Sequence, residues 1–235
     1  TDSGLGLASV PTSEQRSEVK KKTHQWSKRN PFQSVLLDSR LLSRKGSKKE
    51  VRHYSLNLEA SGLTYAPGDA LNIVPQNHSD LVDSILAKLE FSPDTEVEGF
   101  DSTLNTLLKT QFEIVTPTKK LVTEIANRAK RSELKSLHRS DNKVAKDKFL
   151  WGKDCLDLLS IELDYPLEVN EFVDLLKPLQ HRAYSISSSQ LVHENEVHMT
   201  IAGVRWMQAN REHRGVASTW LADGVNIGHP NPIFF

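Results

Sequence analysis

The sequence contains a single cysteine, Cys155, in 235 residues and therefore no internal disulfide. This scarcity is typical of a protein from a reducing compartment. Long apolar runs are also missing, so no segment is predicted to span a membrane. The polar start of the chain lacks the ordered basic, apolar and small-residue regions of a secretory signal. Together these absences predict a cytoplasmic protein.

Charge of either sign is not in excess, because thirty lysines and arginines balance thirty aspartates and glutamates. A formal net charge of zero argues against a nucleic-acid binder that depends on bulk charge. Basic residues do gather locally, at 20–29 and at 119–131. Each cluster is interpreted either as a solvated surface or as a docking face for an acidic partner.

The sequence does contain strand-like patterns toward both ends. Strands are predicted over 32–43 and 50–59, with the turn RKGSKK between them, and within 65–75 beside a Pro-Gly pair. Strand character returns at 181–189 and 195–206. The second strand is predicted to have one wet and one dry face, because Val51, His53, Ser55 and Asn57 alternate with Tyr54, Leu56 and Leu58.

Between these strands the pattern is helical. Apolar residues fall on one helical stripe over 77–90, where Asn77 or Ser79 can serve as the N-cap. The stretch 116–137 opens with a proline near a helix start and then repeats apolar residues four apart. A further short helix is predicted over 170–179, ended by a proline.

The predicted fold class is α+β. Because each strand-rich part is too small to close a sheet alone, the simplest fold is one antiparallel β-barrel that is interrupted by a helical insertion. Residues 31–76 and 178–235 are assigned to the barrel and 77–177 to the mainly helical connecting insertion. Residues 1–30 carry Ser, Thr, Pro and Lys without apolar periodicity, and they are predicted to be a flexible linker.

The stretch HRAYSISSSQ at 181–190 combines cationic, aromatic and hydroxyl side chains on a predicted strand. Arg182 and Tyr184 are two residues apart and are expected on one face, whereas Ser185 is expected on the other. An arginine fork suits a phosphate or pyrophosphate, and a tyrosine ring offers a surface for stacking. The alternative is an ordinary strand with a half-buried tyrosine and a solvated arginine.

The stretch HRGVASTWLADGV at 213–225 has the composition of a loop that enters a short helix. Gly215 and Ala217 are small enough for a phosphate to approach the backbone, and the N–H groups at a helix start attract anions. The alternative is a structural role in which Ser218 caps a buried helix. With Arg182, this helix start predicts a two-sided clamp for a pyrophosphate.

Other reactive side chains give no catalytic or metal site. His193, His198 and His213 are interpreted as ordinary surface or strand histidines, because no cysteine or carboxylate spacing joins them. Cys155 is interpreted as a small core residue, since neighbouring carboxylates raise a thiol pKa. We therefore predict no catalytic side chain and no metal ligand.

The segments RAYSISSS, ENEVHMTIAGVRW and GVASTWLAD together resemble the flavin-binding part of the ferredoxin-reductase-like diflavin reductases. The resemblance is greatest to the flavoprotein subunit of NADPH-dependent sulfite reductase. VRHYSLNLEASGLTYAPGDALNIVPQN and FLWGKDCLDLLS resemble this family too, so the similarity extends from residue 32 to the end. It implies an FAD-binding barrel with a helical connecting region.

The resemblance also implies roles for individual residues. Arg182 would hold the pyrophosphate, Tyr184 would stack on the isoalloxazine and Ser185 would sit beside the reactive flavin nitrogen. Trp206 stands where the family often has a tyrosine near the adenine. The remaining positions implied to contact the cofactor are Ala183, Thr200, Ile201, Ala202, Gly215, Val216, Ala217, Ser218, Gly152 and Val115. One departure is Ala202, which occupies a place where glycine is common, with Gly203 next to it.

Two parts of such reductases are not found in the sequence. The family receives hydride from NADPH through a doubly wound α/β domain after the barrel, but no G-x-G-x-x-G motif occurs here. A flavodoxin-like FMN domain before the barrel is also missing. We therefore expect a fragment that binds FAD and is inactive with NADPH alone, whereas the full-length parent would use NADPH, FAD and FMN.

The resemblance implies that the parent passes electrons from NADPH through FAD and FMN to a sulfite-reducing haemoprotein. Its expected partners are that haemoprotein subunit and the FMN domain of the same reductase, with no nucleic acid and no membrane. One alternative is the FAD domain of another diflavin reductase, such as the cytochrome P450 reductase type. Another is a non-catalytic module that binds a partner reductase subunit.

Overall fold

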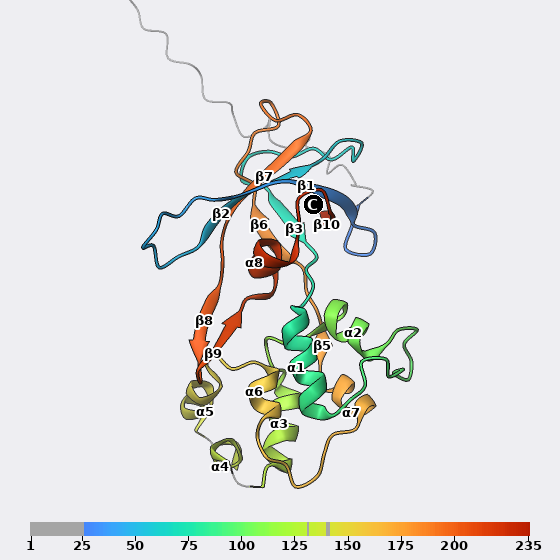
Figure 1. Ribbon diagram of the computed structural model, residues 1–235, viewed down its shortest axis with the longest axis vertical. Coiled ribbons are helices and arrows are strands. Elements are labelled where there is room, and N and C mark those ends of the chain that lie inside the picture. The colour runs from blue at the N-terminus through green and yellow to red at the C-terminus, as the bar shows by residue number, and fades with distance from the viewer. Residues whose placement is uncertain (1–25, 131, 140–141) are drawn as a thin grey trace, which may run out of the picture.

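A computed structural model describes residues 26–130, 132–139 and 142–235. A β-sheet part and a helical part lie toward opposite ends of the long axis (Figure 1). The predicted linker over 1–30 falls outside the described residues except for 26–30, where the Trp26 indole N–H donates to the Ser61 carbonyl at 2.7 Å. No helix within the described ranges combines the length and apolar content needed to cross a membrane.

Six strands form one sheet in which every neighbouring pair is antiparallel. In spatial order they are β6 (Arg182–Ser185), β3 (Ala70–Ile73), β10 (Pro230–Phe234), β1 (Phe32–Leu41), β2 (Val51–Asn57) and β7 (Glu196–Ala202). The two edge strands also approach each other, through a bridge between Ile186 and Met199. Next to this bridge, the Ser187 N–H donates to the His198 carbonyl at 2.9 Å.

The alternation predicted for the second strand is present, with one difference. Tyr54 and Leu56 of β2 are buried in the sheet core, whereas His53 and Asn57 are half-buried on the other face. Ser55 shares that outer face but is itself buried, because its hydroxyl donates to a carboxylate oxygen of Glu196. The sheet core draws its fully buried residues from 36–73 and 186–233.

The helical part has a core of its own, formed by buried residues between 82 and 176. Its helices are α1 (Ser79–Leu89), α2 (Leu104–Thr110), α3 (Lys119–Arg128), α4 (Glu133–Arg139), α5 (Lys143–Leu150), α6 (Cys155–Leu159) and α7 (Val169–Asp174). A short antiparallel pair, β4 (Phe112–Glu113) with β5 (Lys177–Pro178), connects this part to the sheet. Side-chain caps at Thr103, Thr118 and Asn142 satisfy backbone N–H groups at helix starts.

Two helix boundaries differ from the sequence prediction. The stretch 116–137 forms α3 and α4 rather than one helix, because Ala129 takes an extended conformation and pairs with Leu163. The helix predicted over 170–179 ends at Asp174, and Pro178 pairs with Phe112 in the β4–β5 ladder. In both cases a long-range backbone pairing ends the helix before the local pattern does.

The N-cap of α1 was also wrongly predicted. His78 occupies that position and makes no side-chain cap hydrogen bond. The Asn77 side chain is instead buried, and its amide donates to the carbonyls of Leu108 and Phe112, each at 2.7 Å. Asn77 therefore joins α1 to the segment around α2 and β4.

A β-hairpin connects the sheet end to the helical end (Figure 1). Its strands are β8 (Arg205–Gln208) and β9 (Arg211–Arg214), and Ala209 and Asn210 between them both have positive φ angles. Two positive φ values in a two-residue loop match the tight hairpin turn that fits the twist of the strands. After the hairpin come α8 (Val216–Thr219) and a π-helical turn, η2 (Trp220–Gly224).

Candidate functional site

Strand β6 presents Arg182 and Tyr184 on one face. In the ladder with β3, Arg182 lies opposite Ile73 and Tyr184 opposite Leu71. Both side chains are half-buried, and Tyr184 packs against the sheet core, where burial raises the pKa of its hydroxyl. Ala183 and Ser185 are exposed and alternate with them. Arg182 and Tyr184 therefore lie on the sheet face that carries the buried Leu71 and Ile73.

Arg182 is anchored by a carboxylate from the insertion. Its Nη2 donates to Oε2 of Glu113 at 3.1 Å, and its Nη1 donates to the Gln180 carbonyl at 2.8 Å. The Glu113 side chain is 2% exposed and the Arg182 side chain 38% exposed. Because a guanidinium has five N–H donors, this anchoring leaves capacity for an anion on the exposed side.

Glu113 extends the connection to Val115. Its other carboxylate oxygen, Oε1, accepts hydrogen bonds from the backbone N–H of Val115 at 2.9 Å and of Thr116 at 3.2 Å. One buried carboxylate therefore fixes both Arg182 and the 113–116 segment. The sequence analysis did not select Glu113, although a lone acidic residue within the apolar run FEIV is a signal for a buried, paired charge.

A pocket of about 350 Å³ lies beside this segment and contains three of the sequence-predicted residues, Val115, Gly152 and Trp206. The Trp206 indole N–H donates to the Gly152 carbonyl at 2.8 Å, and the indole ring stacks on His213. Gly152 has a φ of 73°, and a Cβ there would lie 3.2 Å from the Trp206 indole nitrogen. Glycine at 152 therefore permits both the turn and the close approach of the indole.

Trp151 adds a second indole to the same pocket and is 82% exposed. Large aromatic side chains are costly to leave in water and are frequent where a flat ligand binds. The pocket therefore offers aromatic surface from both the insertion and the β8–β9 hairpin. Neither Arg182 nor Tyr184 lines it.

The stretch 215–218 docks against the residue before β8. The Gly215 N–H donates to the Val204 carbonyl at 2.8 Å, and the Val204 N–H donates to the Ser218 hydroxyl at 3.1 Å. A Cβ on Gly215 would lie 2.9 Å from the Cβ of Val204. Val216, Ala217 and Ser218 are buried. The Ser218 hydroxyl thus has a structural partner, and the position of Gly215 excludes a side chain.

The three candidates on β7 do not share a face. Ile201 is buried in the sheet core, whereas Thr200 and Ala202 are exposed on the opposite face. The ladder with β2 runs without a shift from Glu196 to Ala202, and Gly203 continues it through a hydrogen bond to the Glu50 carbonyl. Ile201 can therefore meet a ligand outside the core only through its backbone.

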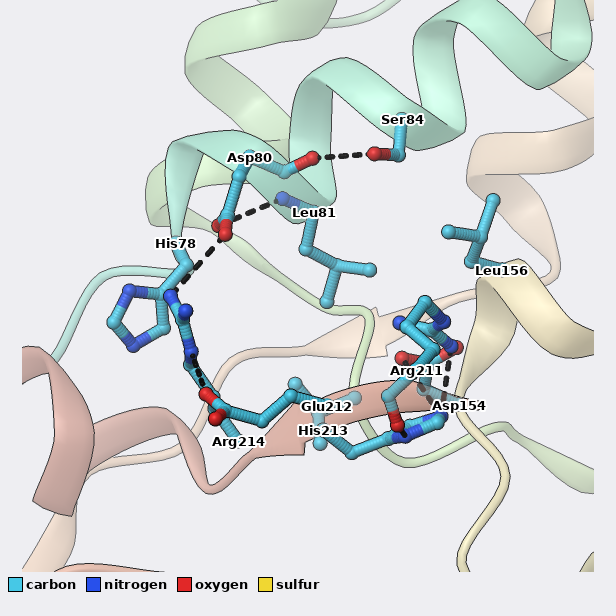
Figure 2. Close-up of a pocket in the computed structure, with 11 residues that line it drawn as sticks. His78, Asp80, Leu81, Ser84, Asp154, Leu156, Arg211, Glu212, His213 and Arg214 are labelled. Atoms are coloured by element: carbon cyan, nitrogen blue, oxygen red, sulfur yellow. Dashed lines mark hydrogen bonds and ion pairs between the residues drawn. The ribbon is translucent and has the colours of Figure 1, made fainter. Parts of the chain in front are cut away.

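A second, smaller pocket of about 130 Å³ lies between the hairpin, α1 and α6 (Figure 2). At its wall the Arg211 guanidinium lies 2.7 Å from Asp154 and 2.8 Å from Asp157. Nε2 of the buried His213 lies 2.8 Å from Asp157. Burial alone would raise the pKa of Asp157, but the hydrogen bonds from Arg211 and His213 hold it below its ordinary value.

These charged groups fasten the hairpin to the insertion. Asp154 and Asp157 form a capping box at the start of α6. The same two carboxylates therefore cap the N-terminus of this helix and bind β9. Arg214 makes a further ion pair with Asp80 of α1, at 3.2 Å (Figure 2). These ion pairs hold the hairpin, which carries Trp206, against the insertion.

Cys155 is fully buried beside this cluster. Burial raises the pKa of its thiol well above the ordinary value, and the nearby carboxylates of Asp154 and Glu113 raise it further. A thiol kept protonated in a core is a poor nucleophile. The sequence-based interpretation of Cys155 as a small core residue is confirmed.

Comparison with known proteins identifies the family. Residues 24–220 match the family described as FAD binding domain. The chain is 35% identical over 213 residues to the sulfite reductase [NADPH] flavoprotein alpha-component of Bacillus subtilis (strain 168), covering 89% of this chain and 35% of that protein. It is 34% identical over 214 residues to the protein of the same name from Aliivibrio fischeri, covering 90% of this chain and 35% of the relative.

The chain thus spans about a third of the length of these relatives. The family match covers the whole of β1 to α8, and with it every residue that the sequence analysis selected as a candidate contact. The chain belongs to the FAD binding domain family.

Proposed function

We propose that this chain is the FAD-carrying part of an NADPH-dependent sulfite reductase flavoprotein, and that its cofactor lies along the surface from β6 to the β8–β9 hairpin. The main support is the Glu113 carboxylate, which accepts one hydrogen bond from Arg182 and another from the backbone N–H of Val115. Val115 lies at the edge of the 350 Å³ pocket. This single carboxylate connects the candidate phosphate ligand to the candidate adenine end.

The residues present fit FAD in three respects. Arg182 is anchored on one side and exposed on the other, as an anion ligand requires. Helix α8 begins at Val216, and the first N–H groups of a helix have no intrahelical partner, which leaves them available to a phosphate. Tyr184 and Trp206 supply rings at two separate places, which suits a dinucleotide with an aromatic system at each end.

When bound, FAD supplies the capacity to accept a hydride and to release its electrons singly. The task of the side chains is to bind and orient it. Arg182 holds the pyrophosphate, Val216 to Ser218 offer backbone N–H groups to it, and Tyr184 packs on the isoalloxazine. Trp206 and Gly152 form the wall at the adenine end. Ala183, Ser185, Thr200 and Ala202 remain candidate contacts that are exposed on strand faces.

We also propose that the six-stranded sheet closes as a barrel. Support comes from the Ile186–Met199 bridge, which joins the two edge strands β6 and β7. The proposed division into a barrel of 31–76 and 178–235 and an insertion of 77–177 is supported by the two separate hydrophobic cores, whose buried residues divide along these bounds. NADPH, FMN and a sulfite-reducing haemoprotein are proposed for the full-length parent alone.

Flavin binding is tested by incubating the purified chain with FAD, removing free cofactor and recording the visible spectrum. The wild-type chain is expected to be yellow with about one FAD per chain. Arg182→Ala is expected to weaken FAD binding by roughly tenfold or more, because a hydrogen bond to a charged group contributes about 1.5–3 kcal/mol. The exposed Arg44→Ala is the matched control and should bind FAD as the wild type does.

A colourless wild-type preparation, or equal FAD affinity in the Arg182 and Arg44 variants, would contradict the proposed site. The acceptor is tested with the full-length parent, by comparing electron transfer to a sulfite reductase haemoprotein and to a cytochrome P450. Faster reduction of the P450 would favour the alternative diflavin class. A stable complex of flavin-free chain with the haemoprotein would favour the non-catalytic module.

A further inference from the structure

A cluster of histidines lies on the outer face of the sheet, at the β2–β7 pair. The ladder places Ser55 opposite His198 and Asn57 opposite Glu196. The alternate residues of β7, Val197 and Met199, are buried in the core. Because side chains alternate along a strand, Glu196 and His198 project from the opposite, outer face.

The loop before β7 returns a third side chain to this place. Ligand atoms of His193, Glu196 and His198 all lie within 4.8 Å of one another. Nε2 of His198 lies 2.9 Å from Oε2 of Glu196, and the His193 and His198 rings have centroids 4.2 Å apart. His53 of β2 adds a third imidazole, with its ring edge-on to His198 at 4.9 Å.

The cluster is held by its surroundings before any ligand arrives. The backbone N–H of His198 donates to the Ser188 hydroxyl at 2.9 Å. The Ser55 hydroxyl donates to Oε2 of Glu196 at 2.5 Å. The Glu196 side chain is 40% exposed and that of His198 12% exposed. Glu196 and His198 therefore sit on a strand, His193 lies in the loop before it, and the cluster remains reachable from solvent, as a metal-binding cluster requires.

Glu196 has no lysine or arginine partner within the described ranges, since its one ion pair is with His198. The cluster of Asp154, Asp157 and His213 has similar spacing but already contains a cation, the Arg211 guanidinium. The cluster at Glu196 contains no such guanidinium among the described residues. On β1, Asp38 and Arg40 lie opposite Ser55 and His53 and carry opposite charges.

We propose that His193, Glu196 and His198, with His53 beside them, bind one divalent transition-metal cation of the Zn²⁺ class. Two imidazoles and a carboxylate are a donor set that suits zinc and its neighbours Ni²⁺ and Cu²⁺. Binding would replace the His198–Glu196 contact with two bonds to the cation. It would also tie the 187–195 loop, which follows β6, to the strand pair β2–β7. The sequence analysis expected no metal here because it found no carboxylate spacing that joins the histidines, whereas the fold brings Glu196 beside His193 and His198.

The test is a titration of the FAD-loaded chain with ZnCl₂, followed by calorimetry and by metal analysis after desalting. The wild-type chain is expected to take up one Zn²⁺. His193→Asn, a change in a loop, and Glu196→Gln are each expected to weaken binding by roughly tenfold or more. His229→Gln, an exposed histidine outside the cluster, is the matched control and should bind like the wild type.

A second readout is the unfolding temperature with and without Zn²⁺. A cation that binds only the folded chain raises it, and His193→Asn should lose that rise while keeping its metal-free unfolding temperature. The absence of saturable uptake by the wild type would overturn the proposal, as would equal uptake by the His193, Glu196 and His229 variants. The flavin spectrum is recorded in every sample, so that a failure to bind FAD is recognised separately.

Discussion

The guanidinium of Arg182 lies 3.1 Å from the carboxylate of Glu113, a residue 69 positions away in the sequence. This contact crosses from the sheet to the connecting insertion, because Arg182 belongs to β6 and Glu113 to β4. It means that the orientation of the candidate phosphate ligand depends on the insertion.

Glu113→Gln is expected to weaken FAD binding although Glu113 itself is not a proposed contact. A glutamine whose oxygen keeps the Val115 N–H turns its amide toward Nη2 of Arg182, and two donors then oppose each other. We expect a loss of about 1–3 kcal/mol in unfolding free energy and a several-fold lower FAD affinity. Denaturant titration and FAD titration measure the two effects.

The control for this change is Glu59→Gln at an exposed glutamate of the sheet part, which should alter neither quantity. FAD affinity unchanged in Glu113→Gln would show that Arg182 keeps its orientation without the carboxylate.

Gly215→Ala is expected to destabilise the chain by about 1–3 kcal/mol, because the new Cβ would lie 2.9 Å from Val204 Cβ. Gly203→Ala is the matched comparison, since its Cβ would meet the end of the flexible Glu50 side chain at 3.3 Å. Thermal unfolding of both variants distinguishes the two positions. Equal unfolding temperatures would mean that the 215–218 stretch can move away from Val204.

Asp157→Asn is expected to lower the unfolding free energy at neutral pH by about 1–3 kcal/mol, because Arg211 and His213 lose a charged acceptor. The folded-state pKa of Asp157 lies below the ordinary value of 3.8. Its stabilising contribution is therefore fully present above pH 3.8 and is lost as the pH falls through the folded-state pKa.

The difference between wild type and Asp157→Asn should accordingly shrink in acid. Unfolding curves recorded from pH 7 down to pH 3 measure it, with the exposed Asp101→Asn as control. A difference that stays constant over this range would show that the Asp157 charge does not stabilise the hairpin.

Cys155 is expected to resist alkylation in the native chain, because its thiol is fully buried and its pKa is raised. Labelling then requires an opening reaction, and an opening free energy of about 4 kcal/mol slows it roughly a thousandfold relative to the unfolded chain. Iodoacetamide labelling followed by mass spectrometry, with and without denaturant, gives the ratio. Comparable rates in the two conditions would place the thiol at the surface.

Local sequence patterns were sufficient to predict whether most elements are helices or strands. Alternation in β2 and the apolar stripe of α1 follow from periods of two and 3.6 residues, which depend only on neighbours in the chain. Boundaries were less predictable. Ala129 ends α3 by pairing with Leu163, and Pro178 joins β5 by pairing with Phe112, and neither partner is near in the sequence.

In the candidate site, too, some features were predictable from the sequence and others were not. The residue types at Arg182, Tyr184 and Gly215 were recognisable as a pattern, and the family match agrees with the resemblance they carry. The supporting contacts were not recognisable, since Glu113, Asp157 and Arg211 act on residues far along the chain. Buried charges must be paired, but the sequence does not say with which partner.

By itself the sequence determined the chemical nature of the groups on each strand and helix, because side-chain type and short-range periodicity are properties of the chain. Only the tertiary structure decided which of these groups meet. The Glu113–Arg182 contact and the approach of His53 to His198 exist because folding brings distant segments together, where burial and charge then fix their roles.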